Sequence, residues 1–99
     1  MDNIFNYQLP QKDTEVFSTL LQEKNVEIKT IISNTLGTPR EFCSDKDEWV
    51  VLLSGCAKIE IAGEVVKLTK GSSLFIKANT PHKVLKTKKV AHWLAVYIG

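Results

Sequence analysis

Apolar and polar residues alternate along most of the chain, and this period of two predicts a protein built from β-strands. The alternation is clearest at 25–33, where Val26 and Ile28 alternate with Glu27 and Lys29, and again at 57–61. Apolar runs at 48–53 and 90–98 predict buried strands, and shorter strands are expected at 65–68, 73–76 and 83–85. Glycine-containing turns separate several of these segments. About seven or eight short strands of this kind predict a sandwich or a barrel.

One segment near the N-terminus follows a different period. Val16, Phe17, Leu20 and Leu21 recur at helical spacing, and Asp13 can accept a hydrogen bond from a free amide of a first helical turn. We therefore expect a short amphipathic helix within 13–23, packed on the outside of a larger unit. The 99 residues are predicted to form a single domain, with an N-terminal arm and helix at 1–24 and the barrel at 25–99.

Composition and charge narrow the expected partners. The net charge of +2 argues against a nucleic-acid partner, and the lysines at 83, 86, 88 and 89 are typical of the solvated face of an exposed strand. The chain has no apolar run long enough to cross a bilayer and no signal-peptide pattern at its start, so we expect no membrane partner and a cytoplasmic location. In that compartment Cys43 and Cys56 are expected to remain reduced.

Two spaced motifs carry a family resemblance. The stretch from Gly71 to His82 has the spacing of the second cupin motif, with Lys77 in place of its proline and Asn79 in place of its second glycine. Asparagine tolerates the positive φ that a glycine would adopt. Glu48 and Gly55 stand at the spacing that ends the first motif. The chain thus resembles a small single-domain cupin of the cupin-2 type, which implies an all-β double-stranded β-helix, or jelly-roll barrel.

The resemblance also implies a metal site, formed in metal-dependent cupins by two histidines and a glutamate of the first motif and the histidine of the second. This sequence keeps Glu48 and His82 but has no histidine before position 82. Counting from Gly37 places Cys43 and Asp45 at the missing positions; counting back from Glu48 places Phe42 and Ser44, or Glu41 and Cys43, there. The implied ligand set is Glu48, His82 and Cys43, holding zinc, manganese, nickel or iron.

Simpler interpretations of the same residues stay open. His82 could close a turn, Glu48 and His82 could form an acid–imidazole pair without metal, and Cys43 could be a small apolar filler. Asp45 and Asp47 are typical of solvent-facing turn residues. His92 lies on an apolar strand face and is expected to be a satisfied core histidine. Trp49 and Trp93 are expected to pack on a sheet or at a dimer contact, and Cys56 to pack.

Two kinds of function follow from these alternatives. One is a barrel that binds a divalent metal, a small-molecule ligand, or both, with the reaction and even enzymatic activity left open. The other is a metal-free ligand-binding or interaction protein, most simply a homodimer. The resemblance does not decide between them, because one barrel fold serves many functions.

Overall fold

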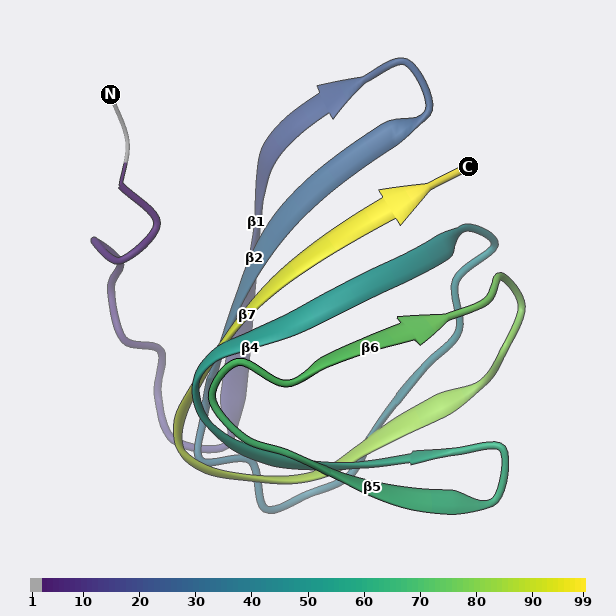
Figure 1. Ribbon diagram of the computed structural model, residues 1–99. Coiled ribbons are helices and arrows are strands. Elements are labelled where there is room, and N and C mark those ends of the chain that lie inside the picture. Colours follow the sequence, from purple (N-terminus) through teal and green to yellow (C-terminus); the bar gives the residue numbers. More distant parts are fainter. Residues whose placement is uncertain (1–2) are drawn as a thin grey trace.

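The molecule consists of antiparallel β-strands (Figure 1). A computed structural model describes residues 3–99. The seven strands are β1 (Thr14–Glu23), β2 (Val26–Asn34), β3 (Arg40–Phe42), β4 (Asp47–Ile61), β5 (Glu64–Leu68), β6 (Ser73–Ile76) and β7 (His82–Ile98). They are hydrogen-bonded in the order β1-β2-β7-β4-β5, with β3 added to β7 and β6 added to β4. The predicted all-β jelly-roll class is confirmed. Within the described residues, no helix has the length and apolar character that crossing a bilayer requires.

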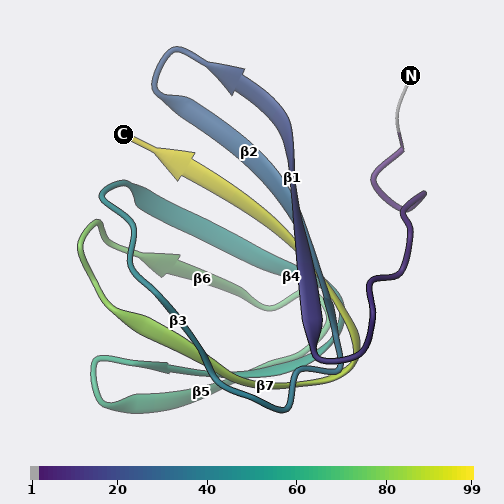
Figure 2. The same ribbon diagram turned by 180° about the vertical axis from the view of Figure 1, so that it is seen from behind.

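The long strands β4 and β7 bend sharply, so that each contributes to both layers of the barrel (Figures 1 and 2). Gly55 lies at the bend of β4 with φ of 85°, and a Cβ there would lie 2.5 Å from the carbonyl oxygen of Val90. Lys89 has φ of 59° in the neighbouring part of β7. Gly55 therefore bends a continuous strand rather than ending one. The strands predicted at 48–53 and 57–61 are both parts of β4, and those predicted at 83–85 and 90–98 are both parts of β7.

The helix expected within 13–23 is wrong, because Thr14–Glu23 is strand β1, paired antiparallel with β2. A β-bulge between Thr19 and Leu21 shifts the alternation, which is why the apolar pairs at 16–17 and 20–21 imitate helical spacing. Lys24, with φ of 54°, turns the chain into β2. The boundary expected between an N-terminal arm with a helix (1–24) and the barrel (25–99) therefore falls inside the β1–β2 hairpin.

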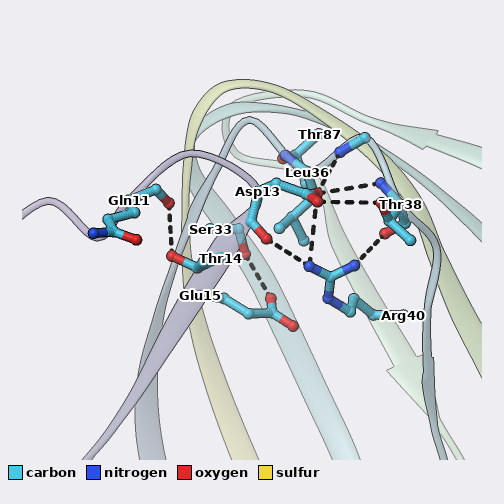
Figure 3. A network of polar contacts seen from close by, with 10 residues as sticks. Gln11, Asp13, Thr14, Glu15, Ser33, Leu36, Thr38, Arg40 and Thr87 are labelled. Atoms are coloured by element: carbon cyan, nitrogen blue, oxygen red, sulfur yellow. Dashed lines mark hydrogen bonds and ion pairs between the residues drawn. The ribbon is translucent and has the colours of Figure 1, made fainter.

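Asp13 closes the corner between the arm, β1 and the loop before β3 (Figure 3). Its Oδ1 accepts hydrogen bonds from the backbone amides of Gly37 (2.9 Å) and Thr38 (3.2 Å), not from a helical turn. Arg40 donates to the Asp13 carbonyl at 2.6 Å and lies 3.6 Å from its carboxylate. The two amides are the main cause that lowers the pKa of the Asp13 carboxyl. The aspartate thus ties the edge hairpin to the rest of the barrel.

The core lies between the two layers and is formed mainly by the inward faces of β2, β4 and β7, with Leu36 from the loop after β2 and Leu68 from β5. Its fully enclosed members include Leu36, Leu52, Ala91 and Ala95, with Trp93 only 4% exposed. Trp93 thus packs inside the barrel, which is one of the two roles expected for it, packing on a sheet or a dimer contact. Trp49 faces out and is 39% exposed. Cys56, expected to pack, is exposed as well.

His92 lies on the other face of β7, beneath the N-terminal arm. The arm runs along the outside of the sheet (Figures 1 and 2), and the rings of Phe5 and Tyr7 lie 5.4 and 5.0 Å from the His92 ring. The His92 side chain is fully buried, but neither ring nitrogen has a hydrogen-bond partner within residues 3–99. The expectation of a satisfied histidine is therefore wrong. Burial without a partner lowers the pKa of His92.

Candidate functional site

Glu48 and His82 face each other inside the mouth of the barrel. Glu48 is the second residue of β4 and His82 the first of β7, and both pair with residues that line the same space. The two residues are 7% and 8% exposed, and Glu48 Oε1 lies 3.9 Å from His82 Nε2. The two motifs therefore bring together the residues that sequence spacing singled out, from strands that lie far apart in the sequence.

The loop before β7 fixes the orientation of the imidazole. Asn79 has φ of 61°, the positive value expected where the motif carries glycine, and its amide donates to the carbonyl of Ser44 at 2.6 Å. His82 Nδ1 lies 3.1 Å from the carbonyl oxygen of Thr80. A carbonyl oxygen can only accept, so Nδ1 carries the hydrogen. Nε2 is then the nitrogen that points toward Glu48.

Burial dominates the electrostatics of Glu48. It raises the pKa of the carboxyl, while the nearby His82, a hydrogen bond with the Tyr97 hydroxyl and the charge of Lys29 act in the opposite direction. The pKa of Tyr97 is also raised, first by burial and then by the adjacent Glu48. The Glu48 carboxylate is thus held in a site that disfavours its charge, beside groups that partly compensate for it.

A pocket of about 120 Å³ opens in front of this pair. Its lining is mainly apolar, with aliphatic side chains from four strands and four aromatic residues, which are Phe17, Phe42, Trp93 and Tyr97. Phe42 stacks on His82 with ring centroids 5.8 Å apart, and Phe17 lies 6.1 Å from Phe42. The pocket combines apolar walls with a small number of buried polar groups, as small-molecule sites do.

β1 supplies Glu15 and Phe17, which sequence reasoning missed. The Ser33 hydroxyl donates to Glu15 at 2.9 Å (Figure 3) and accepts from the Trp93 indole at 3.1 Å. This chain of hydrogen bonds fixes both Glu15 and the Trp93 ring at the pocket. A strand assignment for 14–23 would have placed residues 15 and 17 on one face. Tyr97 carried no such signal, because it was one apolar residue in an apolar run.

The other candidate ligands do not gather around Glu48 and His82. Cys43 is exposed at the rim of the pocket, Glu41 is exposed and lies 3.3 Å from Lys83, and Asp47 accepts from the Ala78 amide at 2.9 Å. Asp45 is exposed, while Phe42 and Ser44 line the pocket. Nowhere in residues 3–99 do three His, Cys, Asp or Glu side chains come together as a metal site requires. His92, on the opposite face of β7, takes no part.

Comparison with known proteins agrees with this architecture. The family profile described as "Cupin domain" matches residues 30–97. A protein from Ralstonia eutropha JMP134, provisionally described as a mannose-6-phosphate isomerase, is 33% identical, with a TM-score of 0.87 over 99% of this chain and 96% of that one. No curated protein matches the sequence.

Two more distant structures share the fold. A conserved Streptococcus pyogenes protein of unknown function is 24% identical, with a TM-score of 0.73 over 89% of this chain and 76% of that one. The cupin domain of an XRE-family transcriptional regulator from Enterobacter cloacae is 19% identical, also with a TM-score of 0.73, over 86% of this chain and 96% of that one.

Proposed function

Since this chain belongs to the cupin family, we propose that it binds a small organic molecule in the mouth of its barrel, where Glu48 and His82 fix the ligand's orientation. The observation that carries the proposal is the meeting of a buried carboxylate and a buried imidazole in front of an apolar pocket. Burying two such groups costs stability that packing alone does not recover. Their cost is explained if a ligand uses them. The same carboxyl–imidazole pair can exchange a proton with a reactive ligand that lies between its two side chains.

A resident divalent ion is the second candidate, supported by the family and by the facing positions of Glu48 and His82. The donor set fits it poorly, because stable sites use three or four protein donors and the described part of the chain brings together two. Zinc, manganese, nickel or iron would be held by Glu48 and His82, with Cys43 at the rim as the additional donor. We therefore assign the pocket to an organic ligand and derive no step through a metal.

The activity suggested for the Ralstonia relative is not proposed for this chain. A sugar phosphate needs cationic groups for its phosphate, and of the described residues that line the pocket none is a lysine or an arginine. A cavity of about 120 Å³ is also smaller than a benzene-sized engineered cavity of about 150 Å³. The site suits a smaller molecule.

The proposal is tested by whether a neutral probe enters the pocket. The two tryptophans provide an internal comparison, because the Trp93 indole lies at the pocket and Trp49 lies on the outer face. We expect 2-methylpropan-1-ol to shift the Trp93 indole signal in a ¹H–¹⁵N spectrum and to leave Trp49 in place. Val84→Phe, which fills the pocket, should abolish the shift, whereas Val65→Phe at an exposed position should not. Equal shifts of both tryptophans, or none, would contradict the proposal.

We also propose that two copies of the chain pair through the outer face of β4 and β6. Trp49 and Phe75 are directly paired across these strands and are 39% and 52% exposed, so they form a contiguous apolar surface. Trp93, one of the residues considered for such a contact, is buried in the core instead. Sedimentation at micromolar concentration should give a dimer, and Trp49→Lys with Phe75→Lys should give a monomer. A monomeric wild-type protein would refute the pairing.

A further inference from the structure

Glu48 and His82 are the two most deeply buried polar side chains that the pocket offers to a ligand. The Thr80 carbonyl lies 3.1 Å from His82 Nδ1, so Nε2 is the ring nitrogen that remains open to a ligand, and it lies 3.9 Å from Glu48 Oε1. This separation is longer than a direct hydrogen bond. An N–H or O–H group of a ligand can therefore bind the Glu48 carboxylate beside the imidazole.

The charge of the lining points the same way. Glu15 and Glu48 both line the pocket, and within the described part of the chain no lysine or arginine does. Because Glu48 is only 7% exposed, solvent screens its charge weakly. A cationic ligand gains from both carboxylates, whereas an anion is repelled by both.

The walls favour a cation over a neutral donor. Phe17, Phe42, Trp93 and Tyr97 surround the space in front of Glu48, and aromatic faces attract cations within about 6 Å of the ring centroid. The protein already uses this attraction at the rim, where Lys29 Nζ lies 5.4 Å from the centroid of Tyr97. Lys29 is also 3.9 Å from Glu27 and is not part of the pocket lining. Of the four aromatic residues in the lining, Tyr97 alone has a lysine or arginine over its ring among residues 3–99, which leaves Phe17, Phe42 and Trp93 available to a cationic ligand.

We propose that the ligand of this pocket is a small primary ammonium ion, whose N–H groups bind the Glu48 carboxylate beside His82 and whose short alkyl body packs against the aromatic walls. The inference rests on the proposed function, since it specifies the class of molecule that the barrel mouth binds. A volume of about 120 Å³, compared with the cavity of about 150 Å³ that takes up benzene, favours a ligand whose buried part is small. Short branched alkylamines meet the requirements of charge and size.

Three probes of matched shape test this proposal at pH 8, where an alkylamine is protonated. The probes are 2-methylpropan-1-amine, 2-methylpropan-1-ol and 2-methylpropanoate, titrated while the indole signals of Trp93 and Trp49 are followed. We expect the amine to bind at least tenfold more tightly than the alcohol, and the carboxylate not to shift Trp93. The preference should disappear in Glu48→Gln and persist in Glu64→Gln, an exposed carboxylate in the β4–β5 hairpin.

A second variant separates the aromatic contribution from the charge. Phe42→Leu keeps an apolar wall but removes one aromatic face, so it should weaken the amine several-fold more than the alcohol. Thermal melting of each variant identifies any that fail to fold, and the three probes still decide the question on the wild-type protein. If the alcohol or the carboxylate binds as tightly as the amine, the ammonium assignment is overturned while ligand binding stands. If no probe shifts Trp93, the proposed function falls as well.

Discussion

Replacing His92 with leucine should make the protein more stable, because this histidine is buried without a hydrogen-bond partner among residues 3–99. Its side chain is 0% exposed, and neither nitrogen is hydrogen-bonded within residues 3–99. A buried donor or acceptor without a partner costs about 1–3 kcal/mol. Leucine has a similar volume and no polar atom. It loses the edge-to-face contact with Phe5 and the tilted contact with Tyr7, worth about 0.5–1.5 kcal/mol per pair.

Since both ring nitrogens lack partners among residues 3–99, their combined cost of about 2–6 kcal/mol exceeds the loss of about 1–3 kcal/mol from the two ring contacts. We therefore expect a gain of at least about 1 kcal/mol in the free energy of unfolding, and each such kcal/mol raises the Tm of a domain of this size by about 4–8 °C. The effect of pH gives an independent check. Burial lowers the pKa of His92 in the folded state below its ordinary value of 6.5. The unfolded chain therefore takes up a proton that the folded protein does not, and stability falls as the pH drops below 6.5.

The assay is urea unfolding at pH 7.5 and pH 5.5. The wild-type protein should lose up to about 1.4 kcal/mol for the one pH unit below 6.5, and this loss should be absent from His92→Leu apart from what other groups contribute. The control is Leu94→Ala on the same strand face, which should lower stability equally at both pH values. If His92→Leu lowers stability by more than about 1 kcal/mol at pH 7.5, or keeps the full wild-type pH dependence, the reasoning about the arm and the buried imidazole is refuted.

Four other results are expected. Glu48→Gln should raise the free energy of unfolding at pH 8 by about 1 kcal/mol. Because burial raises the folded pKa of Glu48 above 4.5, this gain should shrink as the pH falls toward 4.5. A constant or negative difference in urea unfolding would contradict this. Gly55→Ala should cost more than about 3 kcal/mol, because its Cβ meets backbone at positive φ, whereas Gly37→Ala should be nearly neutral; equal costs would refute the strained bend. Asp13→Asn should lower Tm at pH 7, an effect that disappears in acid because the folded pKa of Asp13 is lowered below 3.8; a difference that persists at pH 2 argues against it. Elemental analysis should find far less than one equivalent of metal both in wild-type protein purified without chelators and in His82→Ala; one equivalent that only the wild-type protein holds would restore the metal site.

The barrel and the central pair of the site could be predicted because both depend on short-range signals. The spacing from Gly71 to His82 encodes a turn, with Asn79 at positive φ, that ends where His82 enters its strand. Glu48 opens the apolar run of β4. The β4–β7 register pairs Glu48 with Tyr97 and His82 with Ile61, so the two residues meet only because both long strands bend across the two layers of the barrel (Figure 1).

The remainder depends on contacts that no local pattern contains. The bulge in β1 disguised a strand as a helix, and with it concealed Glu15 and Phe17. His92 is buried by Phe5 and Tyr7 from the far end of the chain, so its missing partners become visible only when the arm is placed. The sequence allowed several alignments of the first motif that differ by one residue around Cys43. A shift of one residue moves a side chain to the opposite face of a strand, so the sequence could not show where Cys43 points.

The central claim is that a ligand lies in the barrel mouth, between Glu48 and His82. The most direct measurement is of intermolecular nuclear Overhauser effects from bound 2-methylpropan-1-amine to the assigned protein. We predict contacts with the Trp93 indole, the Phe42 ring and Ile76, all of which line the pocket. Contacts confined to Leu20 and Ile32, which line the groove between the arm and the outer face of the sheet, would place the ligand elsewhere and contradict the account.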